Sequence, residues 1–275
     1  MKHWNSRLKI GALIVAFFLV VSYVLSLFCP YSDVMEWGAF GKNLKPSSEH
    51  LFGTTGLGQD TFWVLIMSLK NSLTIGITTA FFATVIGVAL GLFAGLRGGL
   101  ADRIITLIMD SLIAIPNLPI LILFGSMLKG RAPWTLISLV LIFFSWPWPA
   151  RQTRSMALSL RENDFISTAR FSGENSIKII GLEIFPFVSD WSVANFTNTI
   201  LSAIGAESTL AFIGMSNNGF PTLGTMIYWA QSRQAILTEL WWWIGSPVVG
   251  ITLLFVALFM TLTGYQNYAT MKRGK

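Results

Sequence analysis

Residues 151–186 read RQTRSMALSLRENDFISTARFSGENSIKIIGLEIFP, and this polar stretch separates two apolar blocks of the chain. It carries five of the nineteen lysine and arginine residues. A helix-forming run at 165–171 meets Gly173, and a second run at 176–184 stops at Pro186. A helix-Gly-helix element of this kind, on a chain that is otherwise apolar, predicts contact with a soluble partner.

The composition predicts a membrane protein. Of the 275 residues, 53% are hydrophobic and only 12% are charged, whereas soluble domains carry about 25% charged residues. Such a chain can hardly cover a surface that faces water. The net charge is +6, but the basic residues flank apolar segments and form no patch with interleaved aromatic residues. We therefore exclude nucleic acid as a partner.

Six segments are long and apolar enough to be transmembrane helices, which need roughly 20 mostly apolar residues. They are 10–28, 72–96, 104–128, 134–150, 187–213 and 243–264. The sequence thus predicts an all-α, polytopic membrane protein. The first segment has the basic front of a signal peptide, but its apolar run is long and no small-x-small cleavage site precedes Cys29. We expect an uncleaved helix.

Basic residues predict the orientation, because lysine and arginine accumulate in cytoplasmic loops. With the N-terminus inside, the cytoplasmic parts hold 13 of the 19 basic residues. The others are Lys42, Lys45, Lys70, Lys129, Arg131 and Arg233. The bias predicts that both termini and residues 151–186 are cytoplasmic. The long extracytoplasmic segments are then 29–71 and 215–242, the second with a short helix at 225–235.

The second apolar segment has glycine at every fourth position, at Gly87, Gly91 and Gly95. This step places the three glycines on nearly one helix face. Small residues at that spacing let two helix backbones approach closely inside a membrane. We favour packing within the helix bundle of this chain, and the alternative is the seam with a second subunit.

Two carboxylates, Asp110 and Glu207, lie inside predicted membrane segments, where a central charge costs about 2.5–3.5 kcal/mol on insertion scales. Pro116 follows Asp110, so we expect that helix to be kinked or locally unwound. Either carboxylate is a candidate for lining a solute path. The alternative is a structural, hydrogen-bonded group, which we favour for Asp110 and leave open for Glu207.

Within the polar stretch, Gly173 suits the left-handed position that ends a helix, and Glu174 or Asn175 can cap the next helix. An apolar stripe at helical spacing follows, made of Ile177, Ile180 and Ile184. That stripe must face the bundle or a partner. The alternative is a helix that lies on the lipid headgroups beside its own basic residues.

Catalytic and metal-binding patterns are absent from the sequence. There is no G-x-x-x-x-G-K-[ST] run for a nucleotide, no H-E-x-x-H and no G-x-S-x-G. Cys29 is the only cysteine, and His3 and His50 are far apart in sequence. We therefore expect a non-catalytic chain without a metal site and without a cofactor of its own.

The polar stretch resembles the EAA-type coupling loop of permease subunits in ATP-binding-cassette (ABC) importers. That pattern is E-A-A, three residues, Gly, then an aliphatic pair and Pro near the end. The corresponding residues here are Ser167-Thr168-Ala169, Gly173 and Ile184-Phe185-Pro186. Ser167 replaces the acidic residue, which puts a salt bridge from this position to the ATPase in question.

Further stretches resemble the dipeptide/oligopeptide/nickel permease group, and they occur in the same order as in that group. They are HLFGTTGLGQD at 50–60, the pattern Asp102, Arg103, Asp110, Pro116 and Leu118, ESTLAFIGM at 207–215, and residues 221–224 followed by 241–247. Thr55 and Gln59 depart from the Asp and Arg of the first motif. The chain from 50 to 264 is therefore most similar to the six-helix "C" subunit of that group.

The resemblance implies a type I ABC importer permease fold with six transmembrane helices, placed in the plasma or inner membrane. It divides the chain into a first helix with an extracytoplasmic loop (1–71), a permease core with coupling loop 151–186 (72–264) and a basic cytoplasmic tail (265–275). The implied partners are a homologous second permease, two ABC ATPase subunits that bind ATP and Mg, an extracytoplasmic solute-binding protein and the lipid bilayer.

The resemblance also assigns residues to roles. ATPase coupling falls on Asp164, Ser167, Thr168, Ala169, Arg170, Gly173, Ile177 and Pro186. The translocation path takes Asp110, Pro116 and Glu207. Contact with the binding protein falls on Gly53, Thr54, Gly58 and Asp60.

The substrate is predicted to be a peptide, with oligosaccharides as the second choice. Directly coordinated nickel is disfavoured, because His, Cys and carboxylate residues do not cluster in the sequence. Two functions of other classes remain as alternatives. One is an ATP-independent secondary transporter or channel, which the membrane carboxylates suggest but for which no convincing inverted repeat is visible. The other is a membrane scaffold or receptor subunit.

Overall fold

The computed structural model describes residues 6–128 and 133–273, which form helices and loops with one isolated bridge, between Thr54 and Asp60. The elements are α1 (Ser6–Leu25), the 3-10 turn η1 (Ser26–Phe28), α2 (Thr61–Arg97), α3 (Gly99–Ala114), α4 (Asn117–Leu128), α5 (Trp134–Ser145), α6 (Pro147–Leu160), α7 (Asp164–Phe171), α8 (Ser176–Lys178), the π-helical turn η2 (Ile179–Ile184), α9 (Phe185–Phe212), α10 (Leu223–Ser232) and α11 (Trp241–Arg273). The all-α prediction is confirmed. Outside the described residues lie Lys2, His3, Lys129, Arg131 and Lys275.

Three helices of the described chain are long and apolar enough to cross a membrane: Ser6–Phe28, Thr61–Arg97 and Trp241–Met271. A fourth span results if α3 and α4 are counted as one, although they meet at an angle of 77°. Pro116 lies at that break. Its ring and its missing N–H disfavour a continuous helix. The predicted kink is therefore confirmed, whereas the six predicted spans are found only in part.

The predicted fourth segment, 134–150, is not a single helix. α5 ends at Ser145, and α6 begins at Pro147 and continues to Leu160. Proline suits the first position of a helix because the N–H group it lacks has no partner there anyway. The first part of the stretch 151–186 was expected to be a loop, and it is helical instead.

Both ends of the predicted membrane core also need correction. α2 starts at Thr61 instead of residue 72, because Asp60 Oδ1 accepts hydrogen bonds from the backbone N–H groups of Phe62 and Trp63, at 3.0 and 3.2 Å. Such a cap satisfies donors that a helix N-terminus otherwise leaves free. The loop before α2 therefore ends at Asp60, whereas residue 71 was predicted as its last residue. At the other end, α11 runs to Arg273, so the predicted tail is helical as far as it is described.

α6 lies directly along α2. A Cβ atom added to any of three glycines of α2 would come within 2.7 Å of α6, with Gly87 against Pro149, Gly91 against Thr153 and Gly95 against Ala157. Such close approach of two backbones needs residues without a side chain. The predicted packing of these glycines within the chain is confirmed.

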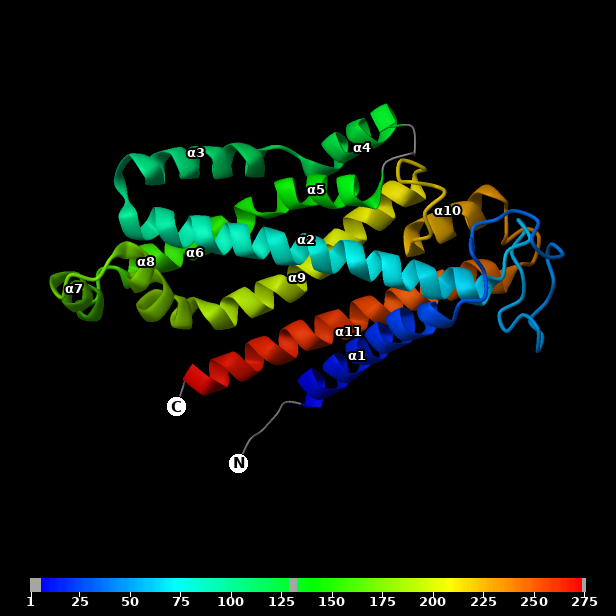
Figure 1. Cartoon of the computed structure of the whole chain (residues 1–275), viewed down its shortest axis with the longest axis horizontal. Helices are drawn as coiled ribbons and strands as arrows, with labels where there is room; N and C mark the ends of the chain where they lie inside the picture. The colour runs from blue at the N-terminus through cyan, green and yellow to red at the C-terminus, as the bar shows by residue number, and fades with distance from the viewer. Residues whose placement is uncertain (1–5, 129–132, 274–275) are drawn as a thin grey trace.

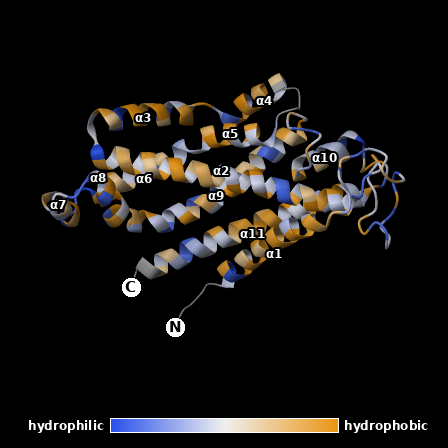
Figure 2. Cartoon of the chain, in the orientation of Figure 1, coloured by the Kyte–Doolittle hydropathy of each residue, from blue (hydrophilic) through white to orange (hydrophobic). Residues whose placement is uncertain are grey.

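The functional segments lie at opposite ends of the molecule. Figure 1 shows α7, the start of α1 and the end of α11 toward one end, and residues 29–60 with α10 at the other. We call these the α7 end and the loop end. Hydrophobic residues dominate the helices between them, and hydrophilic residues appear around α7–α8 and in the 29–60 loop (Figure 2).

Candidate functional site

The α7 end carries the helix-Gly-helix element. Gly173 follows α7 with a φ of 80°, and a Cβ atom built there would meet nothing within 4 Å. The N–H of Glu174 donates to the carbonyl of Ala169 at 3.1 Å, which closes the end of α7. The side-chain oxygen of Asn175 accepts from the N–H of Lys178 at 2.8 Å and so caps α8. The predicted turn and the predicted cap are both present.

The helix that follows does not stop at Pro186, contrary to the prediction. After α8 the chain widens into the π-helical turn Ile179–Ile184 and enters α9 directly, with Pro186 in the first turn of that helix. Pro186 lacks the N–H that would continue the helical hydrogen bonds, and it lies just after the wider π-helical turn. The element at the α7 end is thus joined to α9 without an intervening loop.

The predicted apolar stripe is divided between the bundle and the surface. Ile177 is 80% exposed, whereas Ile184 is fully buried and Ile180 is half-buried. In a π-helical turn the hydrogen bonds join residues five apart. Accordingly Ile179 and Ile184, which are five apart, pack in one cluster with Ile166 of α7. This cluster packs α7 against the rest of the chain.

Most residues assigned to ATPase coupling lie on the surface of this element. Ala169 is the buried one, and it packs in the same cluster as Val88 and Leu92 of α2. Arg170 lies next to it in α7. The exposed residues are Asp164, Ser167, Thr168, Gly173, Ile177 and Pro186.

Exposed apolar side chains accompany these coupling residues. Phe171, Ile177 and Leu182 are 92%, 80% and 61% exposed. We call these three residues the α7 patch. Exposed apolar side chains outside the lipid can contact another protein.

Two ion pairs join α3 to α6. Oδ1 of Asp110 lies 3.7 Å from Nη1 of Arg151, and both side chains are more than half exposed. Arg154 instead donates two hydrogen bonds to Asp102, from Nε to Oδ1 at 2.5 Å and from Nη2 to Oδ2 at 2.8 Å. Pro116 lies exposed at the break beyond α3.

Both arginines were missed as partners of these carboxylates. The sequence did contain the signal, because Asp102 and Asp110 are eight residues apart and Arg151 and Arg154 are three apart. On a helix both spacings place the two residues on one face. What the sequence did not show is that residues 151–160 are helical and lie beside α3.

Glu207 is fully buried on α9. Its Oε1 accepts hydrogen bonds from Oγ1 of Thr222 at 2.9 Å and from Oγ of Ser216 at 3.2 Å, and its Oε2 has no partner among the described residues. Thr222 also caps α10 by accepting from the N–H of Thr225 at 3.1 Å. The carboxylate therefore holds the segment before α10 against α9, which corresponds to the structural alternative for this residue.

The four residues assigned to contact with a binding protein are buried at the loop end: Gly53, Thr54, Gly58 and Asp60. Both glycines have a positive φ, which favours glycine. Oγ1 of Thr54 donates to the carbonyl of Gly41 at 2.6 Å, and Oδ2 of Asp60 lies 2.7 Å from Nδ1 of His50. These residues shape the loop, and the exposed surface beside them is formed by Leu51 and Phe52.

The loop is also tied to the membrane helices. Nε1 of Trp242, at the start of α11, donates a hydrogen bond to the carbonyl of Thr54 at 3.1 Å. Nδ2 of Asn71 on α2 donates to the carbonyl of Pro221 at 2.7 Å, just before α10. The loop end is therefore fastened to α2 and α11 by side-chain hydrogen bonds to backbone carbonyls.

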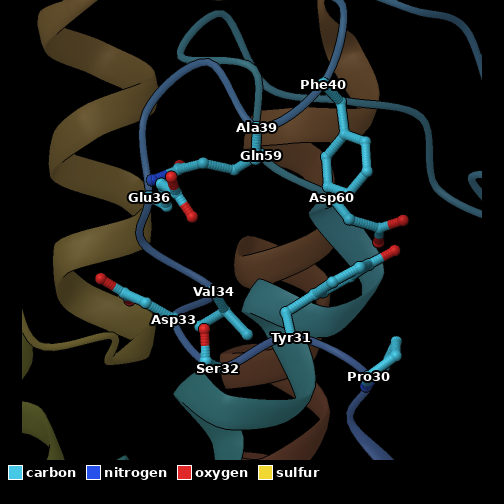
Figure 3. A pocket seen from close by; sticks show the side chains of 10 residues that line it. All are labelled: Pro30, Tyr31, Ser32, Asp33, Val34, Glu36, Ala39, Phe40, Gln59 and Asp60. Atoms are coloured by element: carbon cyan, nitrogen blue, oxygen red, sulfur yellow. The ribbon is translucent and has the colours of Figure 1, made fainter.

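A polar cavity of about 200 Å³ opens in the same loop, and it is lined by residues from 30 to 40 and by Gln59 and Asp60. Figure 3 shows the ring of Tyr31 beside the side chains of Phe40 and Asp60, with Asp33 and Glu36 farther away. Burial raises the pKa of Tyr31 above its ordinary value of 10.0, and the nearby Asp60 and Cys29 raise it further. The acidic side chains in the lining are Asp33, Glu36 and Asp60.

Comparison with known proteins identifies a family model and relatives to which this chain is similar. The family model described as "Binding-protein-dependent transport system inner membrane component" matches residues 87–271. The oligopeptide transport system permease protein OppC of Lactococcus lactis subsp. cremoris (strain SK11) is 30% identical over 249 residues, which cover 90% of this chain and 84% of that protein. The dipeptide transport system permease protein DppC of Bacillus subtilis (strain 168) is 29% identical over 264 residues, which cover 96% and 81%.

A solved structure has a similar fold. One chain of the MetNI methionine ABC transporter, in an inward-facing conformation, matches with a TM-score of 0.58 and 17% identity. The match covers 76% of this chain and 96% of that chain. At this level of identity the likeness concerns the fold alone.

Proposed function

This chain belongs to the family of binding-protein-dependent transport system inner membrane components, and from that premise we propose that it is a permease subunit of an ABC importer for peptides. The chain catalyses no reaction itself, and ATP binds with Mg to partner subunits. The observation that carries the proposal is the α7–Gly173–α8 element. It stands exposed at one end of an all-helical membrane chain, inside the region that the family model matches.

The α7 end is the proposed docking surface for an ATPase subunit. The α7 patch supplies apolar contacts, and the exposed residues assigned to coupling surround it. Because η2 joins α8 to α9 as one continuous helical segment, a displacement of α7 and α8 passes into α9 directly. When ATP draws two ATPase subunits together, two such permeases switch as rigid bodies between inward-open and outward-open states.

We infer six spans for the assembled permease: α1, α2, the bent pair α3–α4, the pair α5–α6, α9 and α11. The termini and the α7 end are cytoplasmic in this arrangement. The bias of basic residues supports this orientation, as do the start of α1 and the end of α11, which lie toward the α7 end (Figure 1). The permease core then begins at Thr61 with α2.

Two further partners follow from the proposal. A homologous second permease completes the translocation path, since one chain supplies only half of it. An extracytoplasmic solute-binding protein delivers the substrate at the loop end, where Leu51 and Phe52 are exposed beside the buried loop residues. Peptides rank before oligosaccharides as substrates, because both of the relatives compared above are named for peptide transport.

The first test is purification of the complex from its native membrane by a tag on this chain, followed by mass spectrometry. We expect two ABC ATPases, a second permease and a binding protein that holds a peptide. Recovery of this chain alone, repeatedly and under mild detergents, would contradict the proposal. ATP-independent uptake driven by an ion gradient would do the same.

The coupling role is tested by three substitutions at Gly173. Asparagine tolerates a left-handed backbone, so Gly173→Asn should retain ATP-driven peptide uptake. Gly173→Asp has the same shape but adds a charge to the docking surface, and Gly173→Val strains the turn by about 1–2 kcal/mol. We expect both of these variants to insert normally and to lose uptake. Full uptake by Gly173→Asp would argue against an ATPase contact at this position.

A further inference from the structure

The two ion pairs between α3 and α6 differ in kind. Arg154 and Asp102 form a two-point contact, and their side chains are 25% and 16% exposed. Arg151 and Asp110 form a single contact at 3.7 Å, which is longer than a hydrogen bond, and their side chains are 56% and 52% exposed. The first pair is a structural clamp. The second leaves most of its hydrogen-bonding capacity unused.

The open pair lies within the membrane part of the chain. Asp110 is in α3, which forms a candidate span together with α4. Arg151 follows Ala150, whose carbonyl oxygen packs against Gly91 of α2. Gly91 is six residues before the end of α2 at Arg97, or about 9 Å at 1.5 Å per residue. The pair therefore lies farther toward the loop end than the C-terminus of α2 does, and not at the tip of the α7 end.

Exposure of charges at this depth has a physical consequence. Charged side chains in membrane segments face a water-filled path or another protein surface, because lipid solvates them poorly. Asp110, but not Arg151, lines an open cavity of about 590 Å³ together with Asp102, Arg103, Thr106, Leu107, Ser111 and Arg154. This face of α3 and α6 is therefore either a side on which a polar solute can pass or a contact surface for another protein.

We propose that Arg151 and Asp110 form a transit site for the two charged ends of a peptide. Arg151 binds the terminal carboxylate, because a guanidinium offers several N–H donors in one plane. Asp110 binds the terminal ammonium. An exposed and loosely held ion pair adds little to stability, so a substrate can open it at little cost. This inference rests on the proposed peptide importer and deepens it.

The test uses the complete importer in proteoliposomes with saturating binding protein, and it measures ATP-driven uptake of a short alanine peptide. Arg151→Gln and Asp110→Asn should each lower the maximal rate about tenfold, which corresponds to loss of one hydrogen bond to a charged group. The peptide concentration that gives half-maximal uptake should not change, because the binding protein captures the peptide first. Unchanged maximal rates in both variants would overturn the proposal.

A charge swap distinguishes a transit site from an ion pair that only joins α3 to α6. If the pair only joins α3 to α6, the double variant Asp110→Arg with Arg151→Asp restores uptake, and the proposal fails. If the pair binds the two ends of a peptide in a fixed direction, the swap does not restore uptake. The matched control is Arg154→Gln, which removes the clamp and should lower the recovery of the assembled complex.

A capped peptide that the wild-type importer transports gives an independent readout. With a C-terminal amide, Arg151→Gln should transport the peptide as fast as the wild type does, while Asp110→Asn stays impaired. Equal loss for free and amidated peptide in Arg151→Gln would contradict carboxylate binding. Failure of the wild-type importer to transport any peptide would instead refute the proposed function, so the two failures are distinguishable.

Discussion

At the scale of single residues, glycine has two different roles in this chain. Gly173 is in open space, and only its φ of 80° requires glycine. Gly91 has the opposite requirement, because a Cβ atom there would lie 2.1 Å from Oγ1 of Thr153 and 2.2 Å from the carbonyl oxygen of Ala150. The sequence showed both glycines, and their spacing and context were enough to predict both roles.

The substitution Gly91→Ala should therefore force α6 away from α2. Overpacking of this kind costs typically about 1–3 kcal/mol, so we expect a lower melting temperature for the purified complex. Gly245 of α11 is the matched control, because a Cβ atom there meets nothing within 4 Å. Equal melting temperatures for Gly91→Ala and Gly245→Ala would contradict the close packing of α2 on α6.

Glu207 gives a second prediction at this scale. Glu207→Gln keeps an oxygen acceptor for Thr222 and Ser216, whereas Glu207→Leu leaves both buried hydroxyl groups without an acceptor. The unpaired groups cost about 1–3 kcal/mol each. Hydrogen exchange of the α10 amides should therefore be faster in Glu207→Leu and nearly unchanged in Glu207→Gln. Equal exchange in the two variants would show that the carboxylate does not hold α10.

At the scale of elements, the predictions succeeded where local chemistry decides and failed where packing decides. The α7 turn and the α8 cap depend on Gly173 and Asn175 alone, and both were predicted. The helical state of 151–160 depends on packing of α6 against the glycine face of α2. It was missed because α6 is too polar to be recognised as a membrane segment. The π-helical turn was missed because the sequence pattern was read only for spacings of three and four residues, which are typical of an α-helix. A π-helical turn instead relates residues that are five apart.

Deletion of Gly181 tests this turn. Gly181 lies within η2 and a Cβ atom there would meet nothing within 4 Å, so its loss removes no packing. Without it the turn can close as an ordinary α-helical turn in which Ile179 and Ile184 are four residues apart and still share a face, so α7 and α8 keep nearly the same rotation against α9. We expect the shortened chain to assemble with its ATPase and to retain ATP-driven uptake.

Gly181→Ala is the control for this deletion. It changes the same position without changing the number of residues, so it should preserve uptake. Loss of uptake in the deletion variant alone would show that the π-helical turn itself is needed for coupling.

At the scale of the whole molecule, the orientation in the membrane can be measured with single cysteines. Cys29 is the only native cysteine, and Cys29→Ser provides the background. Phe171→Cys at the α7 end should react with a membrane-impermeant maleimide only from the cytoplasmic side. Leu51→Cys at the loop end should react only from the outside. Labelling of both variants from the same side would contradict the proposed topology.

The length of α2 has a consequence for the approach of a binding protein. α2 has 37 residues and is about 55 Å long at 1.5 Å per residue, whereas the hydrocarbon core of a bilayer is about 30 Å thick. Its first turns at the loop end are largely buried in protein. If the excess length lies on that side, it carries the loop beyond the lipid headgroups. The electrostatic potential of anionic lipids decays within about 8 Å at physiological ionic strength. An arriving protein would therefore sense the charge of the loop and hardly that of the lipids, and the lipid composition of the outer leaflet should have little influence on its encounter rate.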